Sequence, residues 1–122
     1  INDLTDAKTL AHLFKYDSVH GVYKGGDVSV VDNCLCIGNQ KIEIYSEMDP
    51  TDLPWLEKEV DLVIESTGKF VTREGSQKHL DAGAKKVLIS APAKGGDVKT
   101  IVLGVNDEII EADDLIVSNA SC

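Results

Sequence analysis

The chain has 122 residues, 43% of them hydrophobic and 27% charged, proportions typical of a folded globular protein rather than a disordered one. Its net charge of −9 argues against a nucleic-acid or anionic-membrane partner, because no basic surface is available to release counterions. No apolar run reaches the roughly 18 residues of a membrane-spanning helix, and no signal-peptide pattern opens the chain. Three cysteines, an odd number, suit a reducing compartment. We therefore expect a cytoplasmic protein.

The first part of the chain predicts a helix over about 5–16. Apolar residues recur there at helical spacing, and Thr5 or Asp6 is placed to cap the first turn. The polar stretch Asp17–Ser18 and Gly21 should end this helix.

The next part alternates with a period of two. The apolar runs are separated by the turn pairs Asp32–Asn33 and Gly38–Asn39. This pattern predicts a three-stranded antiparallel meander over about 28–46, an excursion from the rest of the fold.

The last part alternates strands and helices. Strands are expected at 62–64, 87–89, 101–103 and 115–117, with a helix over about 73–82 that ends at Gly83. Strands that are continuous in Val, Ile and Leu, joined by crossovers, indicate a parallel sheet covered on both faces. The fold class is therefore α/β, a partial Rossmann-type parallel sheet with helices on both faces and the antiparallel excursion. We expect one domain.

Two kinds of residue are candidates for nucleotide binding. The pair Asn2–Asp3 follows an apolar residue and precedes a helix, and in dinucleotide-binding folds an acidic residue in such a position binds the adenosine ribose. Asp3 could equally be an early-helix carboxylate favoured by the helix dipole. Ser66–Thr67–Gly68 and Ser90–Ala91–Pro92 each follow a predicted parallel strand, where open α/β sheets bind ligands. Each could instead be a plain turn.

The cysteines and histidines divide into structural and reactive candidates. Cys34 and Cys36 alternate in one strand and face the same way, and without a second pair of ligands we expect buried thiols and no metal site. Cys122 follows a strand and two small residues, which is how a reactive thiol is placed at a strand-to-helix turn, but a lone cysteine could also be a buried structural residue. The three histidines, His12, His20 and His79, share no metal-ligand spacing and receive no functional role.

Seven segments, in order and at matching spacing, resemble those of glyceraldehyde-3-phosphate dehydrogenases, and the resemblance covers the entire chain. It is nearest to the bacterial, NAD-using, glycolytic branch. The segments are Ile1–Leu4, Tyr16–Gly21, Glu65–Phe70, Ala82–Val87, Ser90–Lys94, Gly104–Asn106 and Ser118–Cys122.

The resemblance implies a role for each matching residue. Cys122 matches the catalytic nucleophile and Ser121 a hydroxyl on the substrate and phosphate side. The residues that match the NAD site are Asn2, Asp3, Met48, Ser66, Thr67, Gly68, Phe70 and Ser90. Met48 departs from the family, which often carries a basic residue there, and it cannot donate a hydrogen bond to the adenine.

The resemblance also implies that this is an internal fragment, a partial NAD-binding domain over 1–122. The Gly-rich pyrophosphate loop should precede Ile1, and the catalytic domain should follow Cys122. The parent would be a homotetramer that acts on glyceraldehyde 3-phosphate, inorganic phosphate and NAD through a Cys122 thioester to give 1,3-bisphosphoglycerate. The fragment alone is expected to be inactive.

Three alternatives share these features. An erythrose-4-phosphate dehydrogenase and an NADP-using paralogue would carry the same motifs. A non-catalytic nucleotide-binding module of flavodoxin-like build would have a similar sheet without the reactive thiol chemistry.

Overall fold

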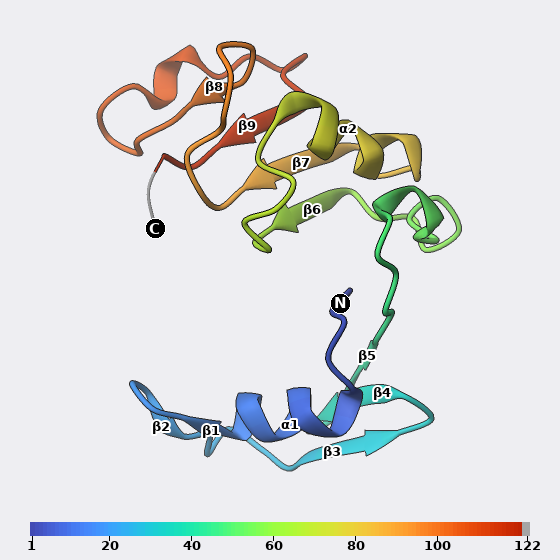
Figure 1. Cartoon of the computed structure of the whole chain (residues 1–122). Coiled ribbons are helices and arrows are strands. Elements are labelled where there is room, and N and C mark those ends of the chain that lie inside the picture. The colour runs from blue at the N-terminus through green and yellow to red at the C-terminus, as the bar shows by residue number, and fades with distance from the viewer. Residues whose placement is uncertain (121–122) are drawn as a thin grey trace. The chain divides into compact units, whose positions relative to one another are not determined.

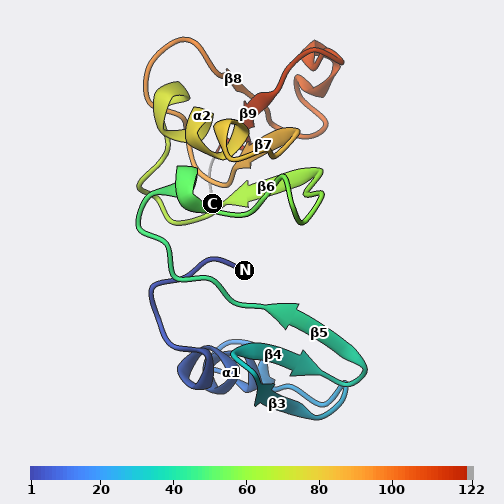
Figure 2. The same ribbon diagram turned by 90° about the vertical axis from the view of Figure 1, so that its right-hand side faces the viewer.

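The computed structural model describes residues 1–120 and confirms an α/β protein with one parallel and one three-stranded antiparallel sheet (Figures 1 and 2). The chain divides into two compact units, Ile1–Met48 and Asp49–Cys122. The sequence analysis placed no boundary at Met48, and that both units form one NAD-binding domain stays a prediction. No helix among the described residues has the length and apolarity needed to cross a membrane.

The first unit begins with helix α1, Ala7–Lys15, which is slightly shorter than the predicted 5–16. Asp6 is the N-cap: its Oδ1 accepts a hydrogen bond from the Thr9 amide at 3.0 Å, which satisfies one amide that the helix itself cannot pair. The helix is followed by a short hairpin of β1, Tyr16–Asp17, and β2, Gly21–Val22, which the sequence did not predict.

The antiparallel sheet confirms the predicted meander. Its strands are β3 (Val28–Val31), β4 (Cys34–Ile37) and β5 (Gln40–Glu43), in the order β3-β4-β5. The first turn has positive φ at both Asp32 and Asn33, 50° and 57°, as a two-residue turn matched to the twist of a hairpin requires. The helix α1 packs against this sheet over a core of Ala7, Leu35 and Ile44.

The second unit is built on a parallel sheet with the strand order β6-β7-β9-β8. The strands are β6 (Leu62–Glu65), β7 (Lys86–Ile89), β8 (Lys99–Thr100) and β9 (Ile116–Ser118). The crossover helix α2, Arg73–Asp81, joins β6 to β7 and begins at the N-cap Thr72, whose Oγ1 accepts from the Gly75 amide at 3.0 Å. Two short 3₁₀ turns, η1 (Pro50–Asp52) and η2 (Asp107–Ile109), complete the unit.

The two faces of this sheet differ in their cover. On the face against α2, alternate residues are buried, with Val87 and Ile89 at 1% and 0% exposure. On the other face, Leu62 and Ile64 are 51% and 61% exposed. Within the second unit, helix α2 therefore covers the face that carries Val87 and Ile89.

One predicted strand is wrong. The chain pairs with β9 at Lys99–Thr100, not at 101–103. Asn106 explains the difference, because its Oδ1 accepts from the Val102 amide at 2.7 Å and its Nδ2 donates to the Thr100 carbonyl at 3.0 Å. These bonds turn the chain directly after Ile101, so the apolar run does not continue as a strand.

Candidate functional site

The candidate cofactor loops of the second unit lie at the carboxyl edge of the parallel sheet. Ser66–Thr67–Gly68 follows β6, and Ser90 follows β7. The Ser90 amide donates to the Glu65 carbonyl at 3.0 Å, so the two strand ends are in register. The three loop residues are exposed and Ser90 is half-buried. This edge is where open α/β sheets bind ligands, as the sequence predicted.

The loop after β6 is anchored to a buried carboxylate. Glu65, only 3% exposed, accepts through Oε1 from the Thr67 amide at 2.9 Å and from the Thr67 hydroxyl at 2.5 Å. Thr67 Oγ1 in turn accepts from the Lys69 amide at 3.1 Å. Gly68, between them, has a φ of 74°, a conformation that L side chains rarely adopt.

The other oxygen of Glu65 contacts a buried histidine. Oε2 lies 2.6 Å from Nε2 of His79, a residue of α2 that is 4% exposed. Nδ1 of the same imidazole accepts from the indole N–H of Trp55 at 3.1 Å. The three buried side chains Glu65, His79 and Trp55 are called the carboxylate relay below.

The charge on Glu65 depends on these bonds. Burial alone would raise its pKa, but the hydrogen bonds from His79 and Thr67 outweigh burial and lower the pKa below 4.5. A lowered carboxyl pKa stabilises the fold above 4.5, its value in the unfolded chain, and the stabilisation is lost as pH falls through the folded value. Glu65 is therefore ionised in the folded protein at neutral pH.

Phe70 ends the loop and is half-buried. Its carbonyl accepts from the hydroxyl of Ser76, at 2.8 Å, and its ring stands edge-on to His79 with centroids 6.4 Å apart. The ammonium of Lys78 lies 5.8 Å from the centroid of the Phe70 ring, within cation–π range. The predicted aromatic is thus held by the same helix that carries His79.

In the first unit, Asn2 and Asp3 lie beside the segment that ends at Met48. Asn2 forms a parallel bridge with Tyr45. Its Nδ2 donates to the Glu47 carbonyl at 3.0 Å and its Oδ1 accepts from the Glu47 amide at 2.9 Å. The Asn2 amide is thus used to hold the chain that leads to Met48, itself 78% exposed.

Asp3 is exposed and forms a local turn. Its Oδ1 accepts from the Thr5 amide at 2.8 Å, whereas the helix cap is Asp6. A carboxylate has about four acceptor positions, so Asp3 keeps capacity to accept hydrogen bonds from a ribose. The remaining predicted residues, Ser121 and Cys122, lie outside the described residues.

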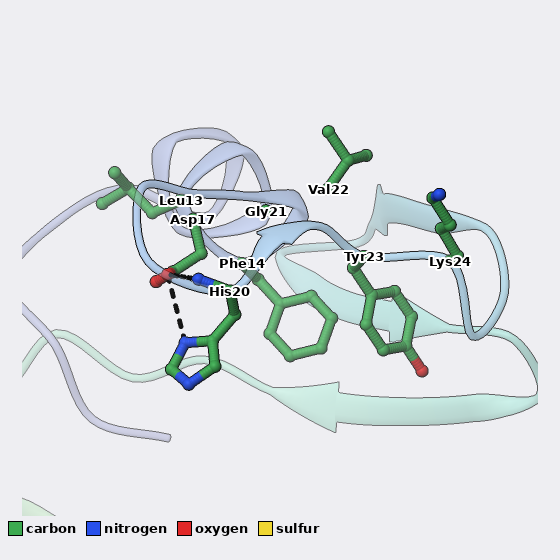
Figure 3. Close-up of a pocket in the computed structure, with 8 residues that line it drawn as sticks. All are labelled: Leu13, Phe14, Asp17, His20, Gly21, Val22, Tyr23 and Lys24. Carbon is green, nitrogen blue, oxygen red and sulfur yellow. Dashed lines mark hydrogen bonds and ion pairs between the residues drawn. The ribbon is translucent and has the colours of Figure 1, made fainter.

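A hollow of about 460 Å³ lies elsewhere in the first unit, and none of the predicted site residues within 1–120 lines it. The rings of Phe14 and Tyr23 lie there tilted by 57° with their centroids 4.8 Å apart, and His20 Nδ1 lies 3.2 Å from Asp17 Oδ1 (Figure 3). The hollow is formed by the end of α1 and the β1–β2 hairpin, and it shows no arrangement of nucleophile and base.

One acidic group could in principle bind a cation. The carboxylates of Glu111, Asp113 and Asp114 lie together, but the ammonium of Lys99 lies 2.7 Å from Glu111 and 2.8 Å from Asp114. Lys99 therefore already supplies positive charge to this cluster.

The sequence analysis missed the carboxylate relay. It gave His79 no role, used Glu65 only as part of the matching segment Glu65–Phe70, and did not consider Trp55. The available signal was a carboxylate at the end of the apolar run Leu62–Ile64, directly before the candidate loop. The pairing itself joins residues 24 and 14 positions apart, which no local pattern reveals.

A parallel sheet whose loops gather at the carboxyl ends of adjacent strands is typical of nucleotide-binding α/β domains. A family model described as glyceraldehyde 3-phosphate dehydrogenase, NAD binding domain, matches residues 1–73, and the chain belongs to this family. The matched region extends from the first unit through β6 and the Ser66–Phe70 loop.

Curated relatives match the chain over its whole length. It is 55% identical to a glyceraldehyde-3-phosphate dehydrogenase of Mycoplasma pneumoniae, 52% identical to one of Thermotoga maritima and 55% identical to one of Geobacillus stearothermophilus. In each comparison the match covers 100% of this chain and 36% of the relative. The chain therefore spans about a third of the length of these relatives.

Proposed function

We propose that the chain forms the cofactor-binding part of a phosphorylating, NAD-dependent glyceraldehyde-3-phosphate dehydrogenase of glycolysis. The observation that carries this proposal is 55% identity over all 122 residues to a relative named glyceraldehyde-3-phosphate dehydrogenase. The exposed loops at the carboxyl edge of the parallel sheet support it. A cytoplasmic location and a homotetrameric parent belong to the same proposal.

Each unit by itself carries residues whose chemistry suits part of a dinucleotide. Asp3 would accept hydrogen bonds from the adenosine ribose, and the segment that Asn2 holds would bring Met48 toward the adenine. Ser66, Thr67 and Gly68 would line the adenosine side, Phe70 would lie near the adenine, and Ser90 would contact the nicotinamide half. When bound, NAD supplies the hydride acceptor for the aldehyde.

The residues that would act on the substrate are Ser121 and Cys122. Cys122 would attack the aldehyde carbon as a thiolate and hold the acyl group as a thioester, which inorganic phosphate would then cleave. A thiol suits this role because it is a strong nucleophile and a good leaving group. Ser121 would bind on the substrate and phosphate side.

The test is an assay of the intact protein that carries this chain. We expect NADH formation from glyceraldehyde 3-phosphate that requires inorganic phosphate, and we expect Cys122→Ser to bind NAD without turnover. Faster turnover of erythrose 4-phosphate, or equal use of NADP, would favour the two enzyme alternatives. NAD binding with no turnover of either aldehyde would favour a binding module.

A further inference from the structure

The carboxylate relay poses a question that packing alone does not answer. Glu65 and His79 are 3% and 4% exposed, and burying such groups is unfavourable unless every polar atom is paired. An apolar pair of similar volume would fill the same space at no such cost. The placement of Glu65 immediately before the Ser66–Gly68 loop suggests what the carboxylate does.

The donors and acceptors of the relay allow a single arrangement. An indole N–H can only donate, so Nδ1 of His79 must accept from Trp55 and carries no proton. The imidazole proton is then on Nε2 and points at Glu65 Oε2, 2.6 Å away. The ring centroids of Trp55 and Phe70 each lie 6.4 Å from that of His79, the first ring nearly parallel to the imidazole and the second edge-on. Its tautomer and orientation are therefore both fixed.

The fixed imidazole leaves the second carboxylate oxygen for the loop. Oε1 holds both polar groups of Thr67, the amide at 2.9 Å and the hydroxyl at 2.5 Å. Trp55, beyond η1, and His79, on α2, thus act on the loop after β6 through one carboxylate. The Glu65 carboxylate thus fixes the loop backbone at Thr67, while Ser66 and Gly68 stay exposed.

We propose that Glu65 is a positioning residue for NAD, which presets the Ser66–Thr67–Gly68 loop and is itself held by His79 and Trp55. The inference rests on the proposed function, since that function assigns this loop to the cofactor. A loop already in its binding conformation loses less conformational freedom on binding, so the relay raises affinity without touching the ligand.

The test uses Glu65→Gln in the intact protein, with the dissociation constant of NAD measured by calorimetry. The amide would keep the shape of the side chain but present an NH₂ group either to the His79 N–H or to the Thr67 donors. One of these two hydrogen-bonded contacts is then always mismatched, which disfavours the preset conformation of the loop. We expect the dissociation constant to rise by about tenfold and kcat at saturating NAD to change little.

A second substitution should restore binding. Trp55→Phe removes the indole donor, so His79 can take the other tautomer and accept at Nε2 from the new amide. Gln at position 65 can then keep its oxygen on Thr67. The double variant Glu65→Gln/Trp55→Phe should therefore bind NAD more tightly than Glu65→Gln alone, a result that an additive structural effect would not give.

Val87→Ala is the control for a purely structural role. Val87 is 1% exposed in the same sheet, and its truncation lowers stability without changing a hydrogen bond to the loop. An unchanged NAD affinity in Val87→Ala supports the proposal. An equal loss of affinity in Val87→Ala, wild-type affinity in Glu65→Gln, or no recovery in the double variant would each overturn it. A wild-type protein that does not bind NAD would overturn the proposed function as well.

Discussion

The two units hold their candidate cofactor residues by different means. In the first, Asn2 and Asp3 are held by hydrogen bonds at the surface, to Glu47 and Thr5. In the second, the Ser66–Gly68 loop is held by a carboxylate that is 3% exposed. Water can replace a surface hydrogen bond at little cost, whereas a buried one has no substitute. The second unit should therefore be far more sensitive to the loss of one polar group.

The largest effect should come from Glu65→Ala. It removes three hydrogen bonds to an ionised carboxylate, one from His79 and two from the amide and hydroxyl of Thr67, and each such bond contributes about 1.5–3 kcal/mol. The single tryptophan, Trp55, lies in the same unit, so urea unfolding followed by its fluorescence reports this unit directly.

Asp61→Ala is the matched control. Asp61 precedes the same strand and pairs with Lys85 at 2.5 Å, but the two side chains are 77% and 73% exposed. Exposed ion pairs contribute little to the free energy of unfolding, so the urea midpoint of the Asp61→Ala variant should stay close to the wild-type value. Equal midpoints for the two variants would show that the relay is not energetically distinct from a surface pair.

The next largest effect separates the two faces of the parallel sheet. Ile89→Ala removes a side chain with 0% exposure and should destabilise the second unit by about 2–5 kcal/mol. Ile64→Ala, on the face where that residue is 61% exposed, should cost far less. The same fluorescence measurement compares them, and a similar cost at both positions would contradict the difference in burial between them.

Much of the fold was predictable because its signals are local. The turn pairs fix the meander, and the Val, Ile and Leu runs fix β6, β7 and β9. The strand predicted at 101–103 is wrong because an Asn106 side chain, several residues further on, competes for the backbone. The β1–β2 hairpin has two residues per strand, too few for any periodicity to be visible.

The candidate site was predictable only in part. Ser66–Gly68 and Ser90 could be placed at one sheet edge because the carboxyl ends of parallel strands share it. The relay could not, since it requires Trp55, Glu65 and His79 from three separate segments to meet. Sequence spacing identifies the exposed residues of a loop more readily than the buried residues that hold it.

In the first unit, Asp3 gives a prediction about cofactor choice. If its carboxylate lies at the ribose, the 2′-phosphate of NADP would bring like charges within a few ångströms, so NAD should be preferred by about 10²-fold. Asp3→Asn keeps an acceptor for the Thr5 amide but removes the charge, and it should narrow this preference. The preference is measured as the ratio of the catalytic efficiencies of the intact protein with NAD and with NADP. Asp27 is also exposed, so the control Asp27→Asn should leave this ratio unchanged.

The smallest effect compares the two helix caps. Thr72 Oγ1 caps α2 and Asp6 Oδ1 caps α1, but only Asp6 titrates. Hydrogen bonds from the hydroxyl and then the amide of Thr9 lower the Asp6 pKa below 3.8. The cap should therefore be fully effective above pH 3.8 and weaken as pH falls through the folded value.

Amide hydrogen exchange should show the protection of the Thr9 amide falling in acid while that of Gly75 stays constant. Asp6→Asn, a cap of similar strength without a charge, should remove the pH dependence at Thr9; a parallel fall at Gly75 would indicate general acid unfolding instead.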